Sequence, residues 1–232
     1  MRNAEAAAHM AWHGNLARWA SLAGAGAFAW LGAATFTAAP AAACLISPGT
    51  STCAPDVLQV SPSATLVSST TGTITANDPS NGQTLSASYT EKVYRDPSNT
   101  VCANCLTWVV QVTNTSSNAD ETIEHVTISN FKGFTTDIGT DSNGAPGFPM
   151  TGTQAPTNVT RNSTGVALGW DFAGSNDVAP GQSTVLLEAE TNATRDVPGT
   201  VSVQDGVSGF GPAYGPALPE VAFVPALALV GG

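Results

Sequence analysis

Oxygen-bearing side chains in one short segment are the first residues here that suggest a chemistry. Asp137, Asp141 and Asn143 follow one another closely, and Gly144 comes directly after them. Carboxylate and amide oxygens are the ligands that calcium prefers, and part of the spacing of an EF-hand loop is present, although its closing glutamate is absent. In the alternative, the same side chains cap backbone amides in an Asx-rich turn. The segment therefore predicts either a calcium site or such a turn.

Two further candidates concern catalysis. Glu188 and Glu190 stand two positions apart on a predicted strand, so they share one face. Paired carboxylates can hydrolyse glycosidic bonds, but no aromatic sugar platform accompanies them, and a solvated acidic face is the expectation. His125 is the only histidine after residue 43, and a Ser-His-Asp triad would need it, yet no Gly-x-Ser-x-Gly motif is present. The sequence assigns no catalytic residue and predicts a non-enzymatic protein.

The four cysteines are Cys44, Cys53, Cys102 and Cys105. An even number of cysteines in an exported chain indicates disulfides, and local pairing favours Cys44–Cys53 and Cys102–Cys105. A redox-active Cys-x-x-Cys pair requires a helix N-terminus to lower the thiol pKa, whereas Cys105 opens a strand pattern. A four-cysteine zinc site is the remaining alternative, but the spacing between Cys44 and Cys53 is unusual for a zinc knuckle. Structural disulfides are therefore expected.

The first 43 residues have the organisation of an export signal. Arg2 and Arg18 supply positive charge, an uncharged and largely apolar stretch follows, and it ends in the small side chains of residues 41–43. This order is typical of a cleavable helical signal peptide. Two alternatives stay open: a retained membrane helix, because the stretch approaches 20 residues, and a lipoprotein lipidated at Cys44. Export predicts a secreted or cell-surface location, with no stable membrane span in the mature chain.

The charge balance restricts the partners. The whole chain carries a formal net charge of −10, and 16 acidic side chains against 5 basic ones follow residue 43. No basic patch is available to neutralise nucleic-acid phosphates or anionic lipid headgroups. The sequence therefore predicts no nucleic-acid partner, and it leaves an unknown extracellular glycan or protein as the expected partner.

Alternation of apolar and polar residues dominates the body of the chain. From residue 57 onward there is no helical periodicity, and period-2 runs separated by turn signals recur instead. The clearest runs cover residues 83–95, 105–114, 122–130, 164–172, 182–191 and 201–203. One polar face per strand predicts an all-β fold, a single antiparallel two-sheet sandwich of the Ig-like kind over residues 56–208. Trp108 and Trp170 have the inward parity and are expected in its core.

Two flanking segments complete the predicted organisation. Residues 44–55 form a cysteine-containing N-terminal segment, and residues 209–232 form a Gly/Pro-rich linker with a short apolar tail. Within the tail, Leu218-Pro219-Glu220-Val221 precedes an apolar run. This arrangement resembles the C-terminal sorting tails of exported bacterial β-sandwich surface proteins, of the PEP-CTERM or sortase type, although the motif is incomplete and no basic residue follows.

The body also resembles such proteins. The resemblance rests on residues 106–114 and 126–134 and on Val178-Ala-Pro-Gly-Gln-Ser183 before a strand, and it implies an architecture without catalytic residues. The expected function is therefore that of an exported, non-enzymatic surface or secreted protein with a structural or adhesive role. Residues 139–156, which lack a strand pattern, are the expected contact region. A carbohydrate- or calcium-binding extracellular module is the alternative.

Overall fold

The structure is a computed structural model that describes residues 44–50, 52–79 and 82–218. The expected signal peptide, residues 1–43, and the apolar part of the tail, residues 219–232, lie outside these residues. Strands account for nearly all the regular structure, and the only helical element within the described residues is a 3-10 turn, η1 (Gly174–Asn176). Within the same residues, no helix has the length and apolar character needed to cross a membrane.

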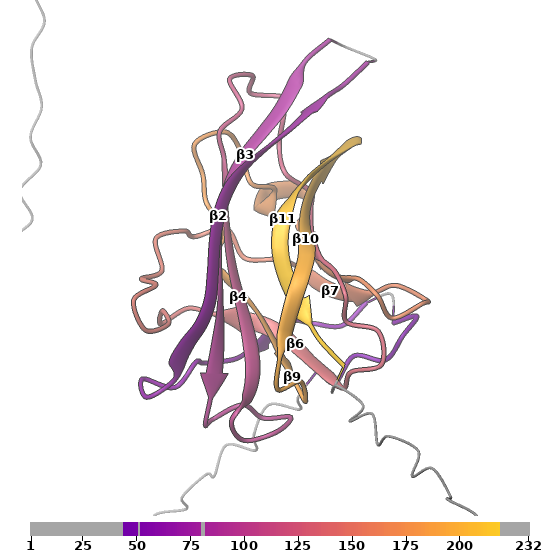
Figure 1. Cartoon of the computed structure of the whole chain (residues 1–232). Coiled ribbons are helices and arrows are strands. Elements are labelled where there is room, and N and C mark those ends of the chain that lie inside the picture. Colours follow the sequence, from indigo (N-terminus) through magenta and orange to yellow (C-terminus); the bar gives the residue numbers. More distant parts are fainter. Residues whose placement is uncertain (1–43, 51, 80–81, 219–232) are drawn as a thin grey trace, which may run out of the picture. The chain divides into compact units, whose positions relative to one another are not determined.

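Two sheets make up the fold (Figure 1). The six-stranded sheet has the order β1-β6-β9-β4-β3-β2, and the five-stranded sheet has the order β11-β10-β5-β8-β7. The strands of the first sheet are β1 (Asp56–Val57), β2 (Thr65–Asn77), β3 (Thr84–Asp96), β4 (Cys105–Asn114), β6 (Thr136–Asp141) and β9 (Leu186–Thr191). Those of the second are β5 (His125–Ile128), β7 (Asn158–Arg161), β8 (Leu168–Asp171), β10 (Asp196–Asp205) and β11 (Val207–Pro216).

The predicted two-sheet β architecture is confirmed, but the sheets are not antiparallel throughout. β1 pairs with β6 in parallel, with Asp56 opposite Gly139. The backbone approach is close there, because a side chain on Gly139 would clash with the Asp56 carbonyl. A glycine in β6 thus allows this short N-terminal strand to lie close beside it.

The two tryptophans that are predicted to face inward do lie in the core between the sheets. Trp108 and Trp170 are fully buried in the main apolar cluster. The Trp108 ring packs edge-on against Phe131 with 5.5 Å between ring centroids, and Trp170 Nε1 donates a hydrogen bond to the Gly139 carbonyl at 2.9 Å. Each indole therefore buries a large apolar surface, and Trp170 also satisfies its one donor.

The N-terminal cysteine segment is part of the sandwich. The structure contains the two expected disulfides, Cys44–Cys53 and Cys102–Cys105. Cys44 and Ile46 are buried in the main cluster, and Cys53 bridges to Val159 of β7. Leu45 bridges to Asp137 of β6, so this segment contacts one strand of each sheet and contributes buried side chains to the core.

The sandwich also extends past the predicted boundary at residue 208. Val207–Pro216 forms β11, which pairs along its whole length with β10. The yellow β10–β11 hairpin lies beside the purple β2 strand of the other sheet (Figure 1). A side chain on Gly211 would meet the Tyr89 ring at 2.7 Å. The glycines that resemble a linker in the sequence are therefore what lets this edge strand pack closely against β2 and β3.

Candidate metal centre

Acidic side chains line the outer face of the six-stranded sheet. In the β6–β9 register, Asp137 lies opposite Glu190 and Gly139 lies opposite Glu188. Paired residues on neighbouring strands project to the same side of a sheet. Ala189 and Leu187 alternate with the two glutamates and belong to the main core, so the glutamates project away from that core. The shared face predicted for Glu188 and Glu190 is thus present.

That face is not solvated, which corrects the expectation for Glu188 and Glu190. Their exposed fractions are 0% and 1%. A second apolar cluster, which combines residues of the sheet with residues of the segment between β1 and β2 and of the segment after β6, covers the strands beside them. Its members are Val60, Ala64, Tyr94, Val109, Ala145, Phe148 and Leu186. Two covering segments therefore remove water from the outer face of the sheet.

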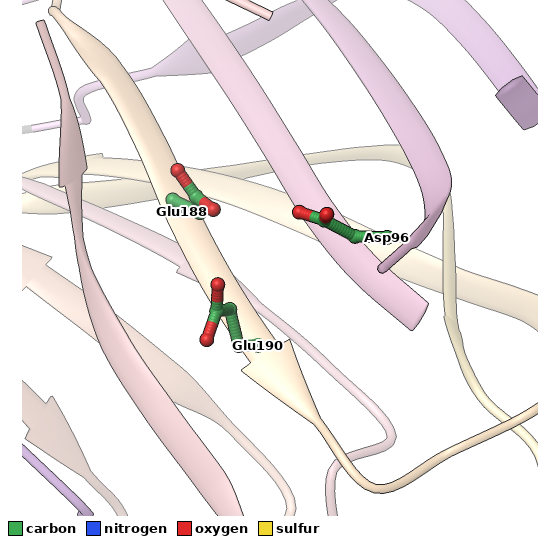
Figure 2. Close-up of side chains that lie close together, drawn as sticks. All are labelled: Asp96, Glu188 and Glu190. Atoms are coloured by element: carbon green, nitrogen blue, oxygen red, sulfur yellow. The ribbon is translucent and has the colours of Figure 1, made fainter. Parts of the chain in front are cut away.

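A third carboxylate joins the two glutamates. One carboxylate oxygen each of Asp96, Glu188 and Glu190 lies within 4.8 Å of the other two, and all three side chains are buried. Figure 2 shows Glu188 and Glu190 projecting from one strand, β9, and Asp96 at the end of another, β3, which is separated from β9 by β4 in the sheet. We call these three residues the carboxylate cluster.

Hydrogen bonds satisfy two members of the carboxylate cluster and leave the third without partners. Asp96 Oδ1 accepts hydrogen bonds from the backbone N–H and the hydroxyl of Ser98, at 2.9 and 2.8 Å. Glu190 Oε2 accepts from the Thr100 N–H at 2.6 Å and from the Thr100 hydroxyl. Both carboxylate oxygens of Glu188 are buried without any hydrogen-bond partner. A buried carboxylate in this state is costly unless another ligand or a proton satisfies it.

Two of the three residues predicted as calcium ligands lie beside the carboxylate cluster. Asp137 and Asp141 are in β6 and not in a turn, and both are buried. Asp141 Oδ1 accepts from the N–H groups of Asn143 and Gly144, at 2.6 and 3.1 Å, as the turn alternative predicts. Asp137 Oδ1 and Asp141 Oδ2 are buried without a partner. The Asn143 side chain is exposed, so the structure does not bring it to the cluster.

The local electrostatics disfavour so many negative charges. Burial raises the pKa of Glu188 well above its ordinary range, and the charges of Glu190 and Asp141 raise it further. Burial is also the main cause of the raised pKa values of Glu190 and Asp137. Two nearby cationic side chains bind carbonyls: Lys92 donates to Gly147, and Arg95 donates to Asn104 and Thr194. A proton or a metal ion is what can offset this charge.

The donor set indicates the kind of metal. Every candidate ligand is a carboxylate oxygen, without nitrogen or sulfur, and such sets select calcium, magnesium or manganese over zinc and copper. Calcium–oxygen distances are about 2.3–2.6 Å, so oxygens on opposite sides of one ion lie about 5 Å apart, which agrees with the 4.8 Å spread of the carboxylate cluster. A glycosidase site instead requires carboxylates that a sugar can reach, and the burial of these glutamates excludes that approach.

Asp96 is the member of the cluster that sequence reasoning missed. Its Asp-Pro-Ser-Asn context predicts a turn, and it does precede one. The signal for burial was present in the neighbouring strands, because residues 105–110 and 185–187 carry apolar side chains on both faces. A strand that is apolar on both faces is covered on both sides, so polar residues beside it are buried too.

The other residues considered for chemistry lie apart from the carboxylate cluster. His125 and Asp171 form a hydrogen-bonded pair on the five-stranded sheet. Trp108 and Trp170 are core residues, and the Cys102–Cys105 disulfide lies in the same β3–β4 connection as Thr100 but does not enclose it. Comparison with known proteins gave no family model that matches the chain, and no curated protein or solved structure that matches it.

Proposed function

We propose that this chain is an exported, non-enzymatic β-sandwich that binds calcium at the carboxylate cluster. The observation that carries the proposal is Glu188, which is fully buried with two unpartnered oxygens and lies within 4.8 Å of two further buried carboxylates. A divalent cation at this point supplies the missing partner for Glu188 and offsets the repulsion among the acids. The Asp96 and Glu188 carboxylates, with Glu190, are the expected ligands.

Two neighbouring carboxylates complete the proposed site. Calcium takes six to eight oxygen ligands, more than the three cluster side chains provide in single-oxygen binding. The unpartnered oxygens of Asp137 and Asp141 are the nearest additional acidic groups that act on Glu188. Bidentate carboxylates or water molecules can supply the remainder.

The site explains a structural role. Its residues come from the end of β3 and from β9, and Thr100 of the following turn donates to Glu190. Ser61, in the covering segment between β1 and β2, also donates its N–H to Asp96, at 3.3 Å. A bound cation therefore holds covering segments onto the sheet, in the way that structural cations stabilise extracellular modules.

The extracytoplasmic location belongs to the same proposal. Two disulfides are compatible with an oxidising compartment, where calcium is abundant enough for millimolar sites to fill. A structural or adhesive role at a bacterial surface follows the resemblance of the body and tail to exported sandwich proteins. Fractionation of the producing cells, with an antibody to the sandwich, tests this location: the protein is expected in the surface or secreted fraction, and recovery from the cytoplasm contradicts it.

The decisive experiment compares Glu188→Gln with wild type, with and without calcium. In excess chelator, we expect Glu188→Gln to be at least as stable as wild type, because it removes a buried charge. In calcium, we expect the order to reverse, because wild type gains about 2.7 kcal/mol at a calcium concentration 100 times the Kd, a rise in Tm of about 5–10 °C. Differential scanning calorimetry and isothermal titration measure both effects.

Glu124→Gln is the matched control. Glu124 is exposed, so the same substitution there removes one negative charge from the surface without touching the carboxylate cluster. This variant should bind calcium like wild type. The proposal fails if wild type shows no calcium-dependent change in Tm, or if Glu188→Gln and Glu124→Gln respond to calcium alike.

A further inference from the structure

A second candidate site lies on the other sheet. A cavity of about 400 Å³ opens where β5, β7 and β8 present their outer faces, with Gly49 and Thr50 at its edge. The register places Thr127, Gly169 and Thr160 side by side on the three strands. Val126, Val159 and Trp170, which alternate with them, belong to the main core. The cavity therefore faces outward, and Gly169 is among the residues that line it.

The hydrogen-bonded pair His125–Asp171 fixes one wall of this cavity. His125 Nδ1 donates a hydrogen bond to Asp171 Oδ1, and the imidazole side chain is only 23% exposed. When Nδ1 carries the proton, Nε2 of the neutral ring is an acceptor. A carboxylate that holds one ring nitrogen in this way sets both the orientation and the tautomer of the other.

Two polar side chains pack closely over the backbone of Gly169. A Cβ on Gly169 would lie 2.8 Å from His125 Nε2 and 2.6 Å from Thr160 Oγ1, so these two side chains already fill the space above this glycine. The two atoms therefore lie close together among the residues that line the cavity, the first as an acceptor and the second as both donor and acceptor. Thr127, opposite Gly169 on the next strand, brings a further hydroxyl. These groups converge on one point, as the polar groups of ligand sites do.

The chemistry of the lining selects a neutral ligand. Arg161 is the only cationic residue that lines the cavity apart from His125, and its guanidinium is committed to main-chain carbonyls. It donates to Ile46, Phe131, Phe134 and Gly165. An anion would therefore find no available cation here, and the acidic chain would repel it. Hydroxyl, amide and imidazole groups instead match a ligand that carries several hydroxyls.

We propose that this cavity binds one neutral sugar residue of an extracellular glycan. One sugar hydroxyl donates to His125 Nε2, and the Thr160 hydroxyl bonds to a neighbouring sugar oxygen. The cavity volume lies within the range of about 300–1,000 Å³ that small-molecule sites occupy. The site is on the opposite sheet from the carboxylate cluster, so it stands whether or not that cluster binds calcium.

The test is a sugar titration of the full chain followed by NMR at the His125 ring. The probes are methyl glycosides of glucose, galactose, mannose and N-acetylglucosamine at millimolar concentrations. We expect a saturable shift of the His125 Cε1–H resonance with at least one of them. Thr160→Val keeps the branched shape but removes the hydroxyl, and it should weaken binding by about fivefold or more. Gly169→Ala should abolish binding, because its methyl group would lie 2.8 Å from His125 Nε2 and 2.6 Å from Thr160 Oγ1 and would displace both side chains.

The controls separate this site from the rest of the protein. Thr135→Val removes a hydroxyl from an exposed threonine outside the cavity and should bind the sugar like wild type. Glu188→Gln should also bind the sugar normally, whatever its effect on calcium. The proposal is overturned if none of the four sugars gives a saturable shift, or if Thr160→Val, whose shape is preserved, binds as tightly as wild type.

Discussion

At the scale of single residues, Arg161 shows how a buried charge can serve the fold. Its side chain is 4% exposed, and its three nitrogens donate to four main-chain carbonyls that come from three separate segments. Burial without a carboxylate partner lowers its pKa. The guanidinium therefore replaces strand pairing for carbonyls that would otherwise be buried without a donor.

Arg161→Met should destabilise the sandwich by about 3–5 kcal/mol, because it leaves several buried carbonyls without a donor. Urea unfolding followed by tryptophan fluorescence measures the change. Lys132→Met is the control, because Lys132 is exposed and its loss should change the free energy of unfolding by less than about 0.5 kcal/mol. An equal effect of the two substitutions would contradict the role given to Arg161.

At the scale of strands, Glu91 connects the two sheets at their edge. It lies in β3 with the parity of Leu85 and Val93, and it is fully buried. Its Oε2 accepts a hydrogen bond from the Tyr214 N–H of β11 at 2.7 Å, whereas Oε1 has no hydrogen-bond partner. Burial raises its pKa to about 8, and the nearby charge of Asp196 contributes to the rise.

This raised pKa predicts how stability depends on pH. Between the ordinary glutamate value near 4.5 and about 8, the folded protein holds a proton that the unfolded chain releases. The contribution of Glu91 is therefore complete below pH 4.5 and is lost as pH rises toward 8, by up to about 1.4 kcal/mol per pH unit. Glu91→Gln keeps the acceptor for Tyr214 and should remove this loss.

Thermal unfolding of wild type and Glu91→Gln from pH 5 to pH 9 checks the prediction. The two proteins should unfold at similar temperatures near pH 5, and the variant should unfold at the higher temperature near pH 9. Glu124→Gln should follow wild type throughout. Parallel curves for wild type and Glu91→Gln would show that Glu91 does not titrate in this window.

Sequence patterns predicted the positions of most strands, but not of all of them. Alternation placed β3, β4, β8 and β9 correctly, because each of these strands has an apolar core face. It missed β11, whose core-facing positions are mostly glycine. Period-2 patterns detect burial of side chains, and glycine buries only backbone.

At the scale of the whole molecule, the proposed cation couples one outer face of the sandwich to its covering segments. The ligands and their hydrogen-bond partners include Asp96, Ser98 and Thr100 around one turn. The cavity that His125 lines is on the other sheet and shares none of these residues. Calcium should therefore act locally.

Hydrogen exchange with mass spectrometry tests this coupling. Calcium should slow amide exchange in residues 97–104 and 58–64, where backbone amides bind the cluster carboxylates, because it raises the free energy of local opening there. Residues 125–128 should exchange at nearly the same rate with and without calcium at low denaturant. Uniform protection across both sheets, or none, would contradict local anchoring by the cation.

The sequence by itself determined the strand parity and the inward position of Trp108 and Trp170, because these depend on local spacing. It favoured the local pairing of the four cysteines, which the structure confirms. It also identified Glu188, Glu190, Asp137 and Asp141 as residues of interest. Only the tertiary structure placed these acids, with Asp96, in one buried cluster. That outcome depends on which segments, distant in the sequence, cover the outer face of the sheet. The local alternation of apolar and polar residues does not show which segments these are.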